Sequence, residues 1–135
     1  MKFKTLTGSI KRVRSPKKFL ISWEDKSRSK FQKRVKDFLV DYWKNDVVFE
    51  EFPVPGTRLS IDFYNANKNI AIEVQGDQHI KFVPHFHGHK GNYLHQLRKD
   101  RQKEDFCELN DIVLVEIFQK EEINKELFSK YNIIL

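Results

Sequence analysis

Two carboxylates, Asp62 and Glu73, lie in short apolar runs that are typical of neighbouring β-strands. The runs cover residues 61–64 and 69–75, and a polar turn separates them. An antiparallel hairpin that closes between positions 65 and 70 places Asp62 directly opposite Glu73. Directly opposed Cβ atoms lie about 5 Å apart, where like charges are destabilising. The pair therefore predicts a cation between the two carboxylates.

The segment before this hairpin predicts a helix that begins after Ser29 and ends near Trp43. Ser29 and Gln32 have the spacing of a capping box, in which each side chain bonds the backbone N–H of the other. The apolar side chains recur at helical spacing and define an inward face: Phe31, Val35, Phe38, Leu39 and Tyr42. The opposite face is expected to lie in solvent: Lys33, Arg34, Lys36, Asp37 and Asp41.

The rest of the domain alternates strand and helix signals. Residues 47–52 have strand propensity and end at the Pro-Val-Pro-Gly turn of residues 53–56, and residues 112–118 form an apolar run typical of a buried strand. Further helices are expected over about 92–109 and 121–131. The first of these should turn four side chains inward: Leu94, Leu97, Phe106 and Leu109. Together these elements predict an α/β fold, a mixed β-sheet flanked by α-helices.

The charge of the chain is concentrated at its N-terminus. The formal net charge is +6, yet residues 1–30 carry ten Lys or Arg against two acidic residues, while the remaining residues carry 15 against 17. We therefore divide the chain into a basic N-terminal arm, residues 1–28, and a domain, residues 29–135. A basic arm on a near-neutral domain favours a polyanionic partner, because each neutralised phosphate releases counterions. The alternative is a solvated segment that only aids solubility.

The composition bounds the class of protein. With 135 residues the chain is long enough for one domain with one core. No run approaches the roughly 20 apolar residues of a membrane-spanning helix, and no charged-then-apolar leader opens the sequence, so we expect no membrane partner and a cytoplasmic location. The single cysteine, Cys107, has no disulfide or CxxC partner and is expected to be a small core residue.

Several short motifs occur in a characteristic order. They are Ser29-x-x-Gln32, Phe49-Glu-Glu-Phe-Pro53, Ser60-Ile-Asp-Phe63, Ile72-Glu-Val-Gln-Gly76 followed by His79, and Asp100-x-x-Lys103 before Asn110-x-Ile-Val-Leu-Val115. Over residues 29–118 this combination resembles the PD-(D/E)XK nuclease superfamily, most closely the branch of the very-short-patch-repair endonucleases and related phage and mobile-element nucleases. The resemblance implies a restriction-endonuclease-like fold. A phage-encoded protein of this kind would act in the cytoplasm of its host.

The resemblance also implies that Asp62, Glu73 and the main-chain carbonyl of Val74 bind a divalent metal ion. This agrees with the cation expected between the facing carboxylates. Hard oxygen ligands suit Mg²⁺ or Mn²⁺, which would polarise the scissile phosphate and lower the pKa of an attacking water. The competing interpretation is that Asp62 is a turn acid and Glu73 a surface strand residue.

Gln75 stands where the family usually has lysine. An amide can orient a water molecule, but it carries no charge and cannot lose a proton. An active enzyme would then take its positive charge from Lys103, Arg101 or His79, and a histidine also suits proton transfer near neutral pH. Asp100 and Lys103 equally have the spacing of an ordinary helical ion pair.

Two further features of the chain bear on the site. Gln32 stands where relatives commonly have a metal-binding glutamate, so the site holds one metal ion or takes Glu50 or Glu51 as a substitute ligand. The long segment of residues 77–92 contains a group of closely spaced histidines: His85, His87 and His89. For these side chains contact with DNA phosphate is favoured over zinc binding, because the chain lacks the partners of a tetrahedral site.

The main prediction is a DNA endonuclease that requires Mg²⁺ or Mn²⁺. The predicted catalytic residues are Asp62, Glu73, Gln75, His79 and Lys103. The predicted DNA-binding residues are Lys11, Arg12, Arg14, Lys17, Lys18, Arg58, His85, His87 and Lys90. A monomer should nick DNA, and a homodimer or two successive events would cut both strands. The alternatives are a DNA-binding module that has lost catalysis and a nuclease subunit of a recombination, transposition or restriction assembly.

Overall fold

A four-stranded sheet forms the centre of the computed structural model, which describes residues 1–76 and 90–135. The sheet has the order β3-β4-β5-β6. Its strands are β3 (Val48–Pro53), β4 (Ser60–Asn65), β5 (Ile70–Gln75) and β6 (Val113–Phe118). The first three strands run antiparallel, whereas β6 lies parallel to β5. This mixed sheet and its helices confirm the predicted α/β class.

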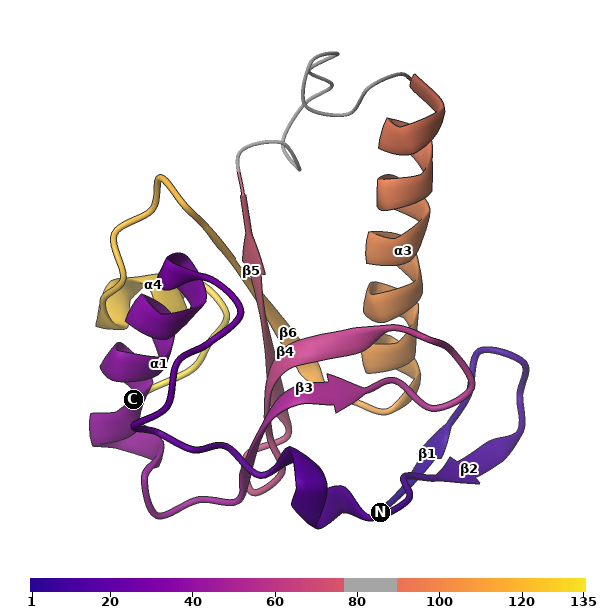
Figure 1. Ribbon diagram of the computed structural model, residues 1–135, viewed down its shortest axis with the longest axis horizontal. Coiled ribbons are helices and arrows are strands. Elements are labelled where there is room, and N and C mark those ends of the chain that lie inside the picture. The colour runs from indigo at the N-terminus through magenta and orange to yellow at the C-terminus, as the bar shows by residue number, and fades with distance from the viewer. Residues whose placement is uncertain (77–89) are drawn as a thin grey trace.

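Helices cover both faces of the sheet (Figure 1). On one face lie α1 (Lys30–Trp43) and α4 (Lys125–Ser129), and on the other lies α3 (Lys90–Leu109). The connection from β5 to β6 contains α3, as a crossover between parallel strands requires. In the part of the chain that the structure describes, no helix is both long enough and apolar enough to cross a membrane.

The hairpin of β4 and β5 has the predicted register. Phe63 pairs with Ile72 and Asn65 with Ile70, as expected for a hairpin that closes between positions 65 and 70. The two strands end within one residue of the apolar runs in the sequence. The predicted pairing of the two strands, which places Asp62 beside Glu73, is therefore confirmed.

Helix α1 begins as predicted but differs on its outer face. The Ser29 side chain accepts a hydrogen bond from the Gln32 N–H (3.1 Å). The Gln32 side chain, expected to complete the capping box, donates instead to Glu50 (2.8 Å). Lys36, expected in solvent, is only 1% exposed, because its ammonium bonds the Glu50 carboxylate (2.9 Å) and the Ser22 carbonyl (2.9 Å). Hydrogen bonds to Glu50 on β3 thus hold two polar side chains of α1, Gln32 and Lys36, in the protein interior.

Helix α3 starts slightly before the predicted position and presents a different inward face. Phe106 is fully buried as expected, and so is Cys107. Three leucines predicted to face inward are instead exposed by 40% or more: Leu94, Leu97 and Leu109. The sheet side chains that share a cleft with α3 include Glu73 and Gln75, so this part of the interface is polar and does not bury leucine.

The closing helix is shorter than the predicted 121–131. Asn124 caps it by accepting a hydrogen bond from the Leu127 N–H (3.1 Å). Glu121 does not join the helix, since its carboxylate accepts from the Phe118 N–H (2.9 Å) at the end of β6. The sequence pattern therefore identified the helix but not its start.

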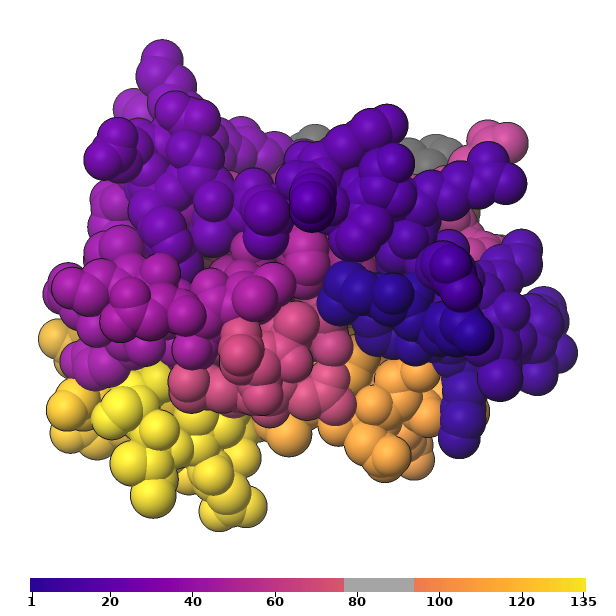
Figure 2. Space-filling view, turned by 90° about the horizontal axis from the view of Figure 1, so that it is seen from below, coloured from indigo at the N-terminus to yellow at the C-terminus, as the bar shows by residue number. Residues whose placement is uncertain are grey.

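The N-terminal segment packs against the domain. It contains a hairpin of β1 (Lys2–Lys4) and β2 (Ile10–Arg12), and Phe3 and Val13 are buried in a cluster with Phe106. Beyond the end of α3, Asn110 accepts a hydrogen bond from the Lys4 N–H (2.8 Å) and donates to the Lys4 carbonyl (3.0 Å). Figure 2 shows the N-terminal residues lying beside this end of α3. The first strand of the predicted basic arm thus packs against the core through Phe3 and is hydrogen-bonded to Asn110 through Lys4.

Candidate active site

Asp62 and Glu73 meet where β4 and β5 separate. The last register pair on this side is Phe63 with Ile72. Beyond it the two carboxylates take over the hydrogen bonds of the ladder: Asp62 N–H donates to Glu73 Oε2 (3.1 Å), and Val74 N–H donates to Asp62 Oδ2 (2.8 Å). Both side chains are buried, with 8% and 4% of their surface exposed. The structure therefore brings the predicted acidic pair together.

Val74 contributes a backbone group to the same place. In a β-strand the N–H and C=O of one residue point to the same side, and the Val74 N–H points to Asp62. Its carbonyl therefore faces the widened gap between β4 and β5. Within residues 1–76 and 90–135, no three His, Cys, Asp or Glu side chains converge as a metal site. The possible metal ligands are thus two carboxylates and a carbonyl oxygen. This set suits an ion such as Mg²⁺, which retains several water ligands.

Lys103 reaches the acidic pair from α3. Its ammonium forms a short ion pair with Glu73 Oε1. Of the three sources of positive charge considered from the sequence, Lys103 thus contacts the acidic pair directly. Arg101 instead pairs with Asp105 (3.2 Å), its neighbour on α3.

The acidic pair carries an electrostatic strain that a cation would relieve. Burial is the main cause that raises the pKa of Asp62 well above its ordinary value, and the neighbouring Glu73 carboxylate raises it further. The Val74 N–H and the Lys103 ammonium act in the opposite direction on this pKa. Burial thus disfavours two negative charges at this place, and a divalent ion between the carboxylates would neutralise both.

A cleft of about 340 Å³ opens over this pair between the sheet and α3. Four cationic side chains line it: Arg28, Arg58, Lys99 and Lys103. Arg58 and Lys103 were predicted as site residues, whereas Arg28 and Lys99 were missed. Lys99 lies one helical turn before Lys103, and this i, i+4 spacing could have indicated that the two share a face. Cations around an acidic floor can bind the phosphates on either side of a metal-bound phosphate.

Gln75 lies on the β5 edge of the cleft, at the position where the nuclease superfamily that the sequence resembles usually has lysine. Only 6% of its surface is exposed. The residue borders the cleft. A side-chain amide in this place can both donate and accept a hydrogen bond.

The carboxylates of Glu50 and Glu51 are already bonded on the α1 side of the sheet. Gln32 donates to Glu50 Oε2 (2.8 Å) and to Glu51 Oε1 (3.1 Å), Lys36 pairs with Glu50, and Ser60 donates to Glu51 (3.2 Å). Neither glutamate lines the cleft. This network favours the single-metal interpretation over a substitute ligand from β3.

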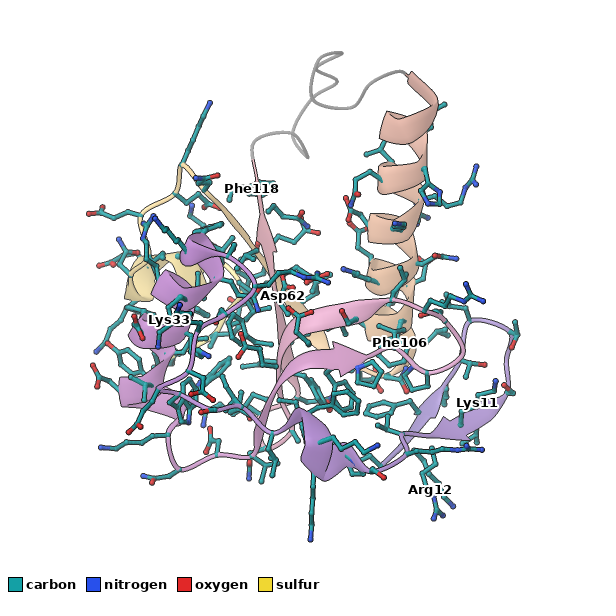
Figure 3. All side chains as sticks on the ribbon, in the orientation of Figure 1. Lys11, Arg12, Lys33, Asp62, Phe106 and Phe118 are labelled. Carbon is teal, nitrogen blue, oxygen red and sulfur yellow. The ribbon has the colours of Figure 1, made fainter. Side chains whose placement is uncertain are left out.

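The predicted DNA-binding residues occupy several places. Five cationic side chains are exposed on the N-terminal segment: Lys11, Arg12, Arg14, Lys17 and Lys18. Figure 3 shows Lys11 and Arg12 on the N-terminal hairpin, apart from Asp62 in the sheet. Lys90 begins α3, but its side chain lies outside the described part of the chain. His79, His85 and His87 also lie outside the described residues.

Comparison with known proteins gives two viral relatives. No protein-family model matches the chain. It is 34% identical over 73 residues, 53% of its length, to uncharacterized protein 307L of Invertebrate iridescent virus 6. It is 32% identical over 80 residues, 59% of its length, to uncharacterized protein 033L of Invertebrate iridescent virus 3. These matches span only 37% and 41% of the two viral proteins, and no solved structure matches the chain.

We expect Asp62→Asn to stabilise the metal-free protein at neutral pH by about 1–3 kcal/mol. The pKa of Asp62 is higher in the folded than in the unfolded state, so its contribution to stability is complete below the unfolded pKa and is lost as the pH rises through the folded pKa. The advantage of asparagine should therefore grow from acidic to neutral pH. Melting temperatures measured in a chelator across this range check it.

Asp37→Asn is the matched control, because Asp37 is exposed on α1 and pairs with Lys33 (2.8 Å). Its effect on the melting temperature should remain small. A difference between Asp62→Asn and the wild type that does not change with pH would contradict the raised pKa of Asp62.

Proposed function

We propose that this chain is a metal-dependent DNA endonuclease of the PD-(D/E)XK type with a restriction-endonuclease-like fold. The observation that carries the proposal is the buried Asp62–Glu73 pair, bonded to the backbone of two separating strands and to Lys103. A buried acidic pair beneath an open, cation-lined cleft fits a metal ion that meets a phosphodiester. The order of elements, a helix, three strands, a helix and a strand, also agrees with the proposal.

The site residues would have different roles in hydrolysis. Asp62, Glu73 and the Val74 carbonyl would hold Mg²⁺ or Mn²⁺, which when bound polarises the phosphate and lowers the pKa of a water molecule. Lys103 stabilises negative charge that develops on the phosphate, and so provides the charge that Gln75 lacks. The Gln75 amide can accept a hydrogen bond from the attacking water and orient it.

The surrounding cations would position the DNA. Arg28, Arg58 and Lys99 line the cleft and can bind phosphates next to the scissile one. The exposed cations of the N-terminal segment would bind a more distant part of the backbone, without reading its sequence. The described residues hold one such acidic pair, so a monomer would nick DNA and a homodimer could cut both strands.

A DNA-binding module without catalysis is the second candidate. Gln32 and Gln75 favour it, because they replace a glutamate and a lysine of the family with uncharged amides. This module would show salt-dependent binding to DNA and no metal-dependent cleavage. A nuclease subunit would cleave only together with its partner protein.

Supercoiled plasmid should be nicked by the wild-type chain in Mg²⁺ or Mn²⁺, and Asp62→Ala and Glu73→Ala should each lower the rate about 1,000-fold. Each substitution removes a metal ligand, and the transition-state stabilisation of a metal ion is worth several kcal/mol. Gel analysis of nicked and linear plasmid over time measures the rate. Asp37→Ala, on the outer surface of α1, should keep the wild-type rate.

Equal rates in the wild type, Asp62→Ala and Glu73→Ala would exclude the proposed site. DNA binding without cleavage in the wild type would instead identify the binding module.

Lys103→Met should lower the cleavage rate about 100-fold, as expected for loss of one group that stabilises transition-state charge. Binding of Mn²⁺ should persist in this variant, because Lys103 is not a ligand. Single-turnover cleavage and calorimetric Mn²⁺ titration measure the two effects separately. Lys130→Met, which removes an exposed lysine near Glu121 (3.8 Å), is the control. An unchanged rate in Lys103→Met would exclude a catalytic role.

The triple substitution Lys11→Ala, Arg12→Ala and Arg14→Ala should weaken binding to duplexes of different sequence by a similar factor. The slope of log K against log salt should fall by about 0.9 for each phosphate that the variant no longer neutralises. Fluorescence anisotropy at several salt concentrations measures this slope. The control removes the same charge elsewhere, with alanine at three exposed lysines: Lys44, Lys120 and Lys130. Equal slopes in the two triple variants would show that the N-terminal segment does not bind DNA.

A further inference from the structure

The face of α3 that points away from the cleft is largely exposed. Figure 1 shows α3 at the side of the molecule, with the hairpin of β1 and β2 near its C-terminal end. Three leucines of the helix are 40–49% exposed: Leu94, Leu97 and Leu109. The side chains of Arg101 and Asp105 are 75% and 46% exposed. Several leucines exposed along one helix favour an interaction surface.

The residues of this outer face have the spacing of a helix that packs on another helix. Steps of four and three residues alternate along one stripe: Leu94, Arg98, Arg101, Asp105 and Glu108. This 4-3 spacing keeps one seam of a helix in contact with a second helix. Leu97 and Leu109 flank the stripe, one on each side. The outer face of α3 therefore has the pattern of a helix–helix seam.

The charges of the seam are divided between its two halves. Arg98 and Arg101 belong to the N-terminal half, and Asp105 and Glu108 to the C-terminal half. In an antiparallel pair of α3 helices from two copies of the chain, each basic half lies against an acidic half. A register with Arg101 opposite Asp105 also places Arg98 opposite Glu108, because both pairs are centred on residue 103. The seam is thus complementary to itself under two-fold symmetry.

The charged side chains of the seam are free to bind a second copy. Within residues 1–76 and 90–135, neither Arg98 nor Glu108 forms an ion pair. Arg101 pairs with Asp105 of its own helix (3.2 Å), and an exposed pair of this kind contributes little to stability. Exchange of this contact for one with a second copy therefore costs little.

A hollow of about 580 Å³ lies at the acidic end of the seam. Its lining combines apolar and acidic side chains: Leu6, Asp105, Glu108 and Leu109. In the antiparallel arrangement the N-terminal end of the second α3 lies at this hollow. That end carries Leu94 and Arg98, an apolar and a cationic side chain. The hollow and the helix end thus match in both chemistry and position.

We infer that the outer face of α3 binds the same face of a second copy of this chain, in an antiparallel and two-fold arrangement. Lys99 and Lys103 lie on the cleft side of α3, so both clefts of the dimer stay open. A helix of this length presents a seam about 30 Å long, which is small for a specific interface, so the dimer should form at micromolar concentrations. The inference does not depend on the proposed nuclease activity.

Exchange of the charges on the seam tests the dimer in the full chain. Arg98→Glu with Arg101→Glu makes the seam acidic throughout, and Asp105→Arg with Glu108→Arg makes it basic throughout. Each double variant alone should self-associate about 100-fold more weakly than the wild type, because like charges then face each other. An equimolar mixture of the two variants should form a heterodimer. Sedimentation equilibrium measures both effects.

Uncharged substitutions test the apolar part of the seam. Leu94→Gln with Leu109→Gln should weaken self-association about 10-fold, because less apolar surface is buried. Lys44→Glu with Lys120→Glu is the control, since both lysines are exposed and lie outside α3. This control changes the charge as much as the acidic seam variant does and should dimerise as the wild type does. Circular dichroism verifies the fold of each variant.

A wild-type chain that stays monomeric up to millimolar concentration would overturn the inference. Failure of the two folded charge variants to associate when mixed would also overturn it. A monomeric chain whose Arg98→Glu, Arg101→Glu variant loses affinity for DNA would instead assign these arginines to DNA binding. Failure of the proposed nuclease function is distinguishable, because it would appear as absence of plasmid cleavage by a chain that still dimerises.

Discussion

The burial of two acidic side chains at the end of one hairpin is the constraint on which this structure depends. Asp62 and Glu73 replace the missing ladder bonds between β4 and β5, so their charge lies inside the protein rather than on its surface. Lys103 offsets part of this charge, which requires α3 to lie over the sheet at this level. In this position α3 turns polar side chains toward the cleft, among them Gln96, Lys99 and Asp100.

Polarity changes along the strands of the sheet. Around Phe63 and Ile72 both faces are apolar, and the aromatic side chains of Phe3, Phe52 and Tyr64 pack edge to face or tilted near the N-terminal hairpin. Carboxylates of the same strands point to both faces, bonded by Gln32 and Lys36 on one side and by Lys103 on the other. The sheet thus combines an apolar core that stabilises the fold with charged groups that border the cleft.

Local patterns were sufficient for some features and not for others. The register of β4 with β5 and the Ser29 cap depend on neighbours in the sequence, and both were predicted correctly. The burial of Lys36 depends on Glu50, and the exposure of Leu94 depends on what the sheet presents to α3, so neither could be read from periodicity. The N-terminal strands have only three residues each, too few to show alternation. Arg28 and Lys99 approach the acidic pair only in the folded chain.

The reactivity of the Cys107 thiol depends on how α3 packs in the protein. It is the single thiol of the chain, lies one helical turn beyond Lys103, and is buried beside Phe106. Burial, and secondly the Glu73 carboxylate, raises the pKa of this thiol to about 12, so at neutral pH it is protonated as well as inaccessible. Alkylation of Cys107 therefore requires a movement that exposes this face of α3, such as separation of α3 from the sheet. Such a movement would also separate Lys103 from Glu73 and widen the cleft between α3 and the sheet.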